Sequence, residues 1–132
     1  MTIALIAEDA KKELMVQFCI AYCGILNRHN LIATGSTAKV VSEATGLNVT
    51  GFLGGAQGGT QQIASRIGYD EIDIVLLFRD TTSGKEGSGD CNELLRLCDV
   101  YNIPVATNIA TAETLIHGLE RGDLDWREIV RS

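Results

Sequence analysis

The chain has few basic residues, and this scarcity limits the kinds of partner that it can bind. Eleven lysines and arginines face 17 aspartates and glutamates, giving a formal net charge of −6. Because no broad basic surface is available, neither a nucleic acid nor an anionic membrane is expected as a partner. An anionic small molecule is still possible, since it needs only a local pocket of hydrogen-bond donors.

Long apolar runs are missing as well. No stretch approaches the roughly 20 residues of a membrane-spanning helix, and the apolar run at 3–7 meets Glu8 and Asp9 too early for a signal peptide. We therefore expect a soluble, cytoplasmic protein. Its 132 residues, 45% of them hydrophobic, fit one globular domain spanning residues 1–132.

Cysteine spacing typical of a metal site is also absent. The chain contains no Cys-x-x-Cys, and its two histidines lie in unrelated segments. Cys19 and Cys23, four positions apart on an expected helix, could form half of a site. Free, buried or half-buried thiols are the better interpretation, so no metal site is expected.

Short apolar runs alternate with amphipathic segments along the whole chain. Strands are expected at 3–7, 31–33, 48–53, 72–78 (the strongest, expected at the centre) and 104–106, and helices at 11–27, 37–45, 60–67, 93–101 and 111–120. This alternation predicts an α/β fold, a single doubly wound domain with a parallel five-stranded sheet and helices on both faces. In such folds, ligands bind at the carboxyl ends of the strands.

Apolar spacing also predicts which helix faces are buried. The expected buried residues of the first and fourth helices are Leu14, Phe18, Ala21 and Ile25, and then Leu94, Leu97, Cys98 and Tyr101. The segment 123–132, which carries Trp126, is expected to pack on the surface.

A glycine flanked by hydroxyl residues stands at the second strand-to-helix junction. Gly35 allows the backbone to approach a ligand, the start of a helix favours an anion, and Thr34, Ser36 and Thr37 add hydroxyl donors. A phosphate-binding cradle is one interpretation. The other is that Ser36 or Thr37 simply caps the helix.

Other polar residues follow the expected strands at the same end of the sheet. The loop that begins at Gly54 and Gly55 has four glycines in six positions, which suits either an anion-binding loop or a flexible connector. Lys12 would be the point charge for a phosphate, the alternative being a solvated surface lysine. With Asp9 and Asp80 nearby, the pattern predicts a site for a small phosphoester or inorganic phosphate, with acid–base chemistry.

The ordered motifs resemble those of the methylglyoxal synthase family along essentially the whole chain. The matching segments are 3–9 with Lys12, 33–37, 43–47, 58–62, 78–80, Asp90 and 103–108. The resemblance implies a doubly wound α/β domain assembled as a homohexamer. It also implies conversion of dihydroxyacetone phosphate to methylglyoxal and inorganic phosphate, without a metal or an organic cofactor.

The resemblance also assigns roles residue by residue. Substrate or phosphate binding would fall to Lys12, Thr34, Gly35, Ser36, Thr37, Gly54 and Gly55, with Ser36 in place of the usual Thr and Gly54 in place of the usual Ser. Asp9, Asp80 and Asp90 match carboxylates of the family's active site.

The sequence differs from the family mainly at the positions of the family's catalytic residues. Thr60 stands where the family has its general base, an aspartate, and Gly87 stands where it has a loop histidine. Glu8 replaces the histidine of a His-Asp pair. A threonine hydroxyl is too weak an acid for its alkoxide to serve near neutrality, and a positioned base contributes about 10²- to 10⁴-fold.

Two hypotheses follow from these departures. The first is an enzyme, either a methylglyoxal synthase homologue with a relocated base or a related lyase acting on another small phosphoester. Asp9 and Asp80 are the first candidates for the base, and Glu8 and Glu86 are also available. The second is a non-catalytic module that binds phosphate or a phosphorylated metabolite.

Overall fold

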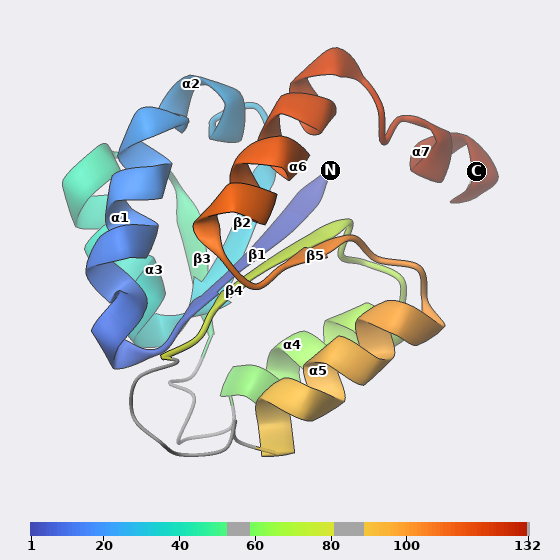
Figure 1. Ribbon diagram of the computed structural model, residues 1–132, viewed down its shortest axis with the longest axis horizontal. Coiled ribbons are helices and arrows are strands. Elements are labelled where there is room, and N and C mark those ends of the chain that lie inside the picture. Colours follow the sequence, from blue (N-terminus) through green and yellow to red (C-terminus); the bar gives the residue numbers. More distant parts are fainter. Residues whose placement is uncertain (53–58, 81–88, 132) are drawn as a thin grey trace.

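The computed structural model describes residues 1–52, 59–80 and 89–131, and the described chain forms a parallel α/β sheet structure. Within these ranges the strands are β1 (Thr2–Ala7), β2 (Asn30–Thr34), β3 (Val49–Phe52), β4 (Ile74–Phe78) and β5 (Val105–Ala106). They form one sheet of order β3-β2-β1-β4-β5 in which all neighbours are parallel (Figure 1). The predicted fold class is confirmed.

Each strand is followed by at least one helix. A 3₁₀ turn η1 (Asp9–Lys11) leads into α1 (Lys12–Ala21) and α2 (Cys23–Leu26). Then come α3 (Gly35–Thr45), α4 (Gly59–Gly68), α5 (Gly89–Val100), α6 (Ile109–Arg121) and α7 (Trp126–Arg131). Gly46 ends α3 in the left-handed conformation (φ 74°) as the sequence predicts, and Asn108 Oδ1 caps α6 by accepting from the Thr111 N–H at 3.0 Å.

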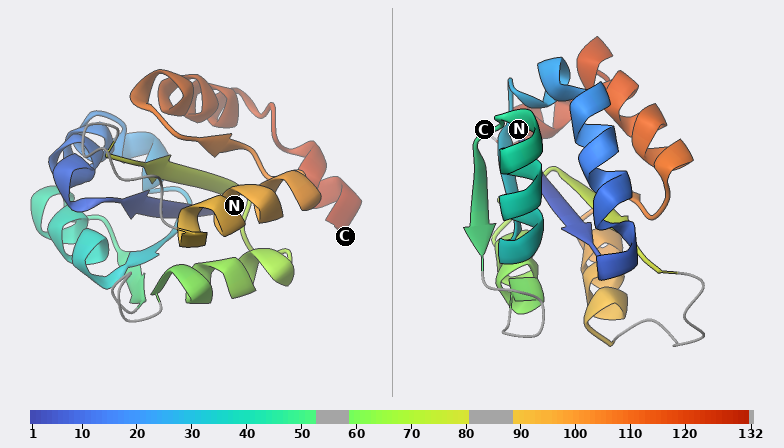
Figure 2. Two further views of the ribbon diagram at one scale, coloured as in Figure 1. Left: turned by 60° about the horizontal axis from the view of Figure 1, so that its bottom comes forward. Right: turned by 90° about the vertical axis from the view of Figure 1, so that its left-hand side faces the viewer.

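Two apolar cores lie on opposite faces of the sheet (Figure 2). Alternate residues of β1 enter different cores: Ile3 and Leu5 pack with α1, α3 and α6, while Ala4 and Ile6 pack with α4 and α5. A strand buried on both faces must be apolar throughout, which is why residues 3–7 form an uninterrupted apolar run.

The structure corrects the first predicted helix. The expected single helix over 11–27 is divided into η1, α1 and α2, with Tyr22 between the last two at φ −112° and ψ 24°. Its fully buried residues are Met15, Phe18, Cys19 and Leu26, whereas Leu14 and Ile25 are half-buried and Ala21 is exposed. Two neighbouring apolar stripes exist on this helix, and only its placement against the sheet selects one of them.

Three further expectations were wrong in detail. The central strand is β1 rather than β4, although β4 is flanked on both sides. Tyr101 lies beyond the end of α5 and is 39% exposed, so Cys91, Leu94 and Cys98 form the buried face of that helix instead. Neither Ser36 nor Thr37 caps α3, because the helix already begins at Gly35.

The four cysteines are free thiols, as expected. Burial raises the pKa of Cys19 to about 12 and that of Cys98 to about 11. Both therefore stay protonated near neutrality and are poor nucleophiles and metal ligands.

A buried ion pair fastens the C-terminal helix to the amino end of the sheet. Arg127 Nε lies 3.4 Å from Asp73 Oδ1, and Arg127 Nη1 donates to the Asn102 carbonyl at 2.6 Å. The other oxygen of Asp73 accepts from the Thr2 N–H at 2.8 Å. The described part of the segment 123–132 does pack on the surface, but through Arg127 rather than Trp126, which is 49% exposed.

No helix in the described ranges is long and apolar enough to cross a membrane.

Candidate functional site

The candidate site lies where the sheet changes its winding direction. From β1 the chain moves through β2 to β3 on one side, and β4 and β5 lie on the other side of β1. The helices α1 and α3 cover one face, and α4 and α5 cover the opposite one. The carboxyl ends of β1 and β4 therefore border the crevice in which open α/β sheets bind ligands. We call this place the switch point and define it by Ala7, Glu8, Phe78 and Asp80.

Backbone pairing brings the two strand ends into register at the switch point. Ala7 lies opposite Phe78 in the parallel ladder. The Glu8 N–H then donates to the Phe78 carbonyl at 3.0 Å, which extends the pairing by one residue.

Lys12 supplies a cation at this point. As the first residue of α1 it reaches back over the end of β1, and its Nζ donates to the Ala7 carbonyl at 3.0 Å and to Asp9 Oδ1 at 2.8 Å. The side chain is only 20% exposed, so it is not the solvated surface lysine of the alternative interpretation. An ammonium has three N–H donors, and two are accounted for here, which leaves one for a ligand.

Asp9 shapes the charge of the site. Its side chain is fully exposed, and the hydrogen bond from Lys12, followed by the lysine charge, lowers the pKa of Asp9. A carboxylate held in its charged form in this way is a weak proton acceptor.

Glu8 makes a contact that joins the two strands through a side chain. Its Oε1 accepts from the backbone N–H of Asp80 at 2.8 Å, so the carboxylate of one strand end holds the backbone of the other. Both residues are half-buried. Sequence reasoning named Glu8 only as an available carboxylate, and the signal that could have singled it out was its substitution for the family's histidine.

The predicted cradle forms the start of α3. Thr34 is the N-cap, with φ −64° and ψ 152°, but its side chain caps no N–H of the helix. Its hydroxyl instead faces that of Thr37, at 3.5 Å. Thr34 and Thr37 are buried, whereas Ser36 is exposed. The first turn of α3 thus offers backbone donors without a side-chain cap, which suits an anion.

The other predicted site residues are placed in part. Thr60 is buried in the first turn of α4. Asp90 belongs to α5, but its side chain is outside the described part. Gly54, Gly55, Glu86 and Gly87 lie outside the described residues. Among the described residues, no group of three or more His, Cys, Asp or Glu side chains could hold a metal ion.

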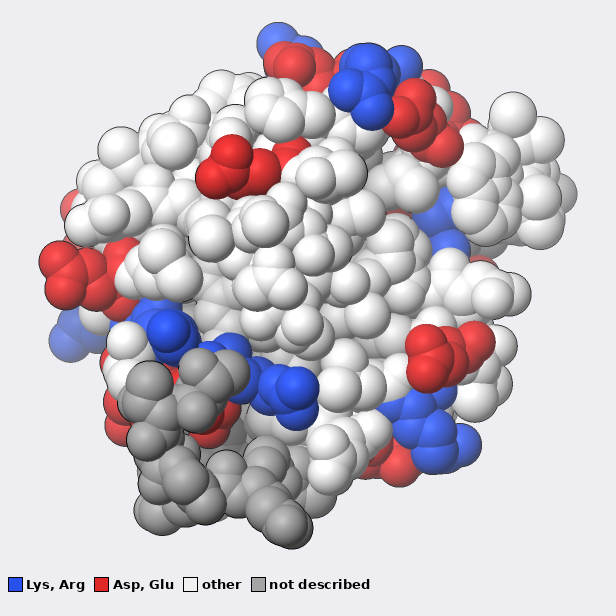
Figure 3. All heavy atoms as spheres, viewed as in Figure 1, with Lys and Arg blue, Asp and Glu red and all other residues white. Residues whose placement is uncertain are grey.

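Charge is distributed unevenly over the surface. The centre of the face shown in Figure 3 is largely uncharged, and one of its groups of Lys and Arg atoms lies at the lower left, beside Asp and Glu atoms, near the place where β1 and β4 end in Figure 1. In a chain of net charge −6, such a local cation is what an anionic ligand requires.

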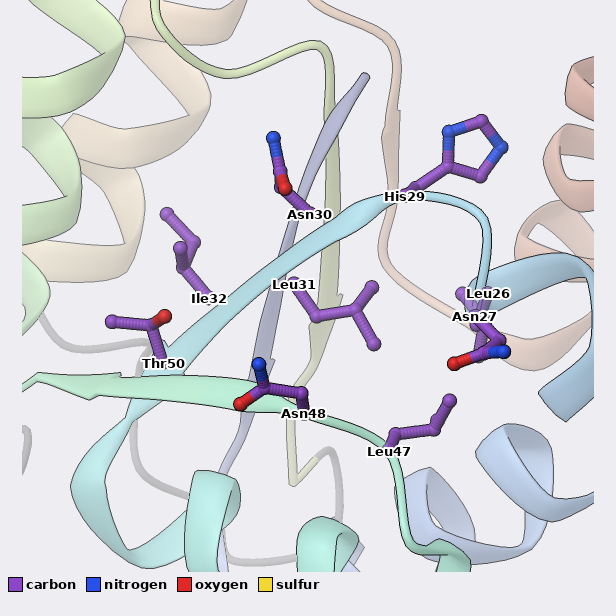
Figure 4. Close-up of a pocket in the computed structure, with 9 residues that line it drawn as sticks. All are labelled: Leu26, Asn27, His29, Asn30, Leu31, Ile32, Leu47, Asn48 and Thr50. Atoms are coloured by element: carbon purple, nitrogen blue, oxygen red, sulfur yellow. The ribbon is translucent and has the colours of Figure 1, made fainter.

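A second hollow lies at the opposite end of the sheet and has different chemistry. It has a volume of about 390 Å³ and lies at the start of β2 and before β3, where Asn27, His29, Asn30 and Asn48 surround apolar side chains (Figure 4). No lysine, arginine, aspartate or glutamate lines it. With no lysine or arginine among its lining residues, this hollow suits a phosphate less well than the switch point does.

Comparisons with known proteins agree on one family. The family model described as MGS-like domain matches residues 15–107. The chain is 62% identical to the methylglyoxal synthase of Caldicellulosiruptor saccharolyticus over 130 residues, which cover 98% of this chain and 92% of that one. It is 51% identical to the methylglyoxal synthase of Oceanobacillus iheyensis over 131 residues, 99% of this chain and 94% of that one.

A solved structure extends the likeness to three dimensions. The crystal structure of methylglyoxal synthase from Elizabethkingia anophelis NUHP1 superposes with a TM-score of 0.82 at 41% identity, covering 87% of this chain and 76% of that chain.

Proposed function

Because the chain belongs to the methylglyoxal synthase family, we propose that it binds dihydroxyacetone phosphate, or a similar small phosphoester, and eliminates its phosphate to give methylglyoxal. The observation that carries the proposal is Lys12, whose ammonium lies over the end of β1 with one N–H donor left for a ligand. Helix α3 follows β2, the strand paired with β1, and its first turn has no side-chain cap. The backbone N–H groups of that turn supply donors for the same phosphate.

The reaction places two demands on such a site. A base must take a proton from carbon next to the carbonyl group, and the phosphate must be held as it leaves with its bonding electrons. Lys12 and the start of α3 would meet the second demand, since a charge-assisted hydrogen bond strengthens as negative charge develops on the leaving group. Thr34, Gly35, Ser36 and Thr37 are proposed as the phosphate cradle, with Gly54 and Gly55 as further members.

Assembly as a homohexamer is part of the proposal and rests on the family resemblance. An exposed apolar area supports it: Tyr101, Trp126 and Val130 border a hollow of about 210 Å³, and Val130 is 76% exposed. Patches of this kind are commonly covered in oligomers. A monomer mass in light scattering at micromolar concentration would reject the homohexamer and leave the proposed binding site unaffected.

A second candidate function is a module that binds the phosphoester without turning it over. Thr60 favours it, because a buried hydroxyl begins α4 where the family places its carboxylate base. Thr60→Asp, alone and combined with Gly87→His, separates the two functions.

The test measures ligand binding and phosphate release in parallel. Calorimetry with phosphoglycolate reports binding, and release of inorganic phosphate from dihydroxyacetone phosphate reports turnover. If the protein is a lyase, the wild type releases phosphate. If it is a binding module, phosphate release by the wild type stays at background, Thr60→Asp gains turnover, and the double variant gains more. Thr114→Asp, exposed on α6, adds the same charge away from the site and should change neither quantity. Absence of phosphoglycolate binding at millimolar concentration would reject both functions.

A further inference from the structure

The elimination needs a base, and the contacts at the switch point distinguish among the available carboxylates. Asp9 points into solvent and is committed to Lys12 at 2.8 Å, which stabilises its charged form and weakens it as a proton acceptor. Asp80 follows β4, and its backbone N–H is held by Glu8. Glu8 differs from Asp9 because no cation is paired with it among the described residues.

The position of Glu8 is fixed from two sides. Its backbone N–H is bonded to the Phe78 carbonyl at 3.0 Å, and its Oε1 accepts from the Asp80 N–H at 2.8 Å. One oxygen of the carboxylate therefore sets the orientation of the group. The other oxygen accepts no hydrogen bond from the described part of the chain, and so can receive a proton. A carboxylate oriented by a backbone N–H, with its second oxygen open, can act as a general base when a substrate places a proton within hydrogen-bond reach of that oxygen.

Glu8 also adjoins the cation that would bind the phosphoester. It follows Ala7, whose carbonyl accepts from Lys12, and it precedes Asp9, the other partner of Lys12. A ligand whose phosphate meets Lys12 and the start of α3 would extend its remaining carbons across the switch point, where Glu8 lies.

We propose that Glu8 is the general base of this protein. It replaces the aspartate that the family has at the position of Thr60, and this inference rests on the proposed function. The Glu8 carboxylate removes a proton from the hydroxymethyl carbon of dihydroxyacetone phosphate, and the electrons of that C–H bond form an enediolate. The hydroxyl oxygen of the enediolate then forms the aldehyde carbonyl and gives its proton to the phosphate, the carbon–carbon double bond shifts to the other terminal carbon, and the bond between that carbon and its phosphate oxygen breaks with its electron pair leaving on the phosphate. The proton on Glu8 is delivered to the methylene carbon of the resulting enolate, which gives methylglyoxal.

Glu8→Gln tests the assignment because it separates the two oxygens of the carboxylate. The amide oxygen of glutamine can still accept from the Asp80 N–H, while the proton-accepting capacity is lost. Incorporation of deuterium from D₂O into dihydroxyacetone phosphate reports proton abstraction by NMR, phosphate release reports elimination, and phosphoglycolate calorimetry reports an intact site. We expect both rates to fall by about 10²- to 10⁴-fold, with phosphoglycolate affinity changed by less than about threefold.

Two companion variants keep the experiment decisive. Glu8→Asp retains a carboxylate that is one methylene shorter, and it should retain more deuterium exchange than Glu8→Gln. Glu13→Gln makes the same change of charge on an exposed residue of α1 and should leave both rates unaltered.

Each failure has its own signature. A wild type that does not bind phosphoglycolate rejects the proposed function, and the assignment of Glu8 falls with it. A wild type that binds but neither exchanges deuterium nor releases phosphate overturns Glu8 as the base and leaves the binding module. Undiminished exchange in Glu8→Gln overturns it directly. Equal losses in Glu8→Gln and Glu8→Asp, or loss of phosphoglycolate binding in both, would show that Glu8 only holds Asp80 in place.

Discussion

The two ends of the sheet both carry charged residues, but they use them in opposite ways. At the amino end, Arg127 and Asp73 are 5% and 3% exposed, and each is bonded to backbone groups as well as to its partner. At the carboxyl end, Lys12 pairs with a fully exposed Asp9 and keeps an N–H donor in reserve. Charges that satisfy one another in the interior maintain the fold, whereas charges with unused hydrogen-bonding capacity near solvent are available to a ligand.

The comparison also separates two kinds of helix attachment. Helix α7 is held to the amino end by the buried side chain of Arg127. Helix α1 is joined to the carboxyl end by Lys12, which contacts the last carbonyl of β1. Removal of the first contact should affect the stability of the fold, and removal of the second should affect ligand binding.

The largest effect is expected at the amino end. Arg127→Met removes the cation beside the buried carboxylate of Asp73, and removing one partner of a buried ion pair typically costs about 3–5 kcal/mol. In a domain of this size the loss should lower Tm by about 10 °C or more, measured by thermal unfolding. Phosphoglycolate affinity of the folded variant should be unchanged, because the altered contact lies at the opposite end of the sheet.

A matched control is the exposed ion pair between Arg96 and Glu93. Arg96→Met should cost no more than about 1 kcal/mol, because both side chains are solvated. If Arg127→Met destabilised the protein no more than Arg96→Met does, the buried pair would not hold α7 in place.

The second effect concerns Lys12. Lys12→Met keeps the length of the side chain and removes its charge, and a charge-assisted hydrogen bond contributes roughly 1.5–3 kcal/mol. Phosphoglycolate binding should therefore weaken about 10- to 100-fold in calorimetry, with little change in Tm. Lys39→Met, on the exposed face of α3, changes net charge equally and should bind as the wild type does. Equal affinity in both variants would remove Lys12 from the proposed site.

The smallest effect concerns the pH dependence of stability and involves His29, which lines the second hollow at the amino end of the sheet. Nδ1 of His29 lies 3.2 Å from the N-terminal ammonium of Met1. Burial, and then the charges of the N-terminus and Arg28, lower the pKa of His29. The unfolded chain therefore binds a proton at His29 more readily than the folded chain does. His29 contributes to the stability of the fold above its unfolded pKa of about 6.5. That contribution is lost as the pH falls through the lower pKa of the folded state.

His29→Gln should accordingly make stability less dependent on pH between about pH 7 and 5. Denaturant unfolding at several pH values measures this, with His117→Gln, exposed on α6, as the comparison. An identical pH dependence in wild type and His29→Gln would show that His29 does not contribute.

Much of the fold could be read from the sequence because strands and helices have different periods. The uninterrupted apolar run at 3–7 predicts a strand covered on both faces, and β1 has that position. Gly46 predicts the end of α3, since glycine adopts a left-handed backbone with little strain. The cradle at Thr34 and the cation at Lys12 were also named from local pattern, and both lie at the carboxyl end of the sheet.

Other features depend on contacts between segments far apart in the chain. The buried stripe of α1 includes Met15 rather than Leu14, because the orientation of the helix against β1 decides which of two apolar stripes faces the core. The importance of Arg127 was missed, because its partner Asp73 is 54 positions away and local periodicity carries no information about such a pair.

The sequence by itself determined the order of strands and helices, the family, and the end of the sheet at which polar residues gather, because local periodicity and ordered motifs encode all three. Only the tertiary structure decided how the carboxylates differ. Glu8 and Asp9 are neighbours in the chain, yet one holds the backbone of Asp80 across the sheet and the other pairs with Lys12 in solvent. The physical reason is that successive side chains at the end of a strand face different surroundings, and those surroundings, which the fold alone assembles, decide which partner each carboxylate contacts.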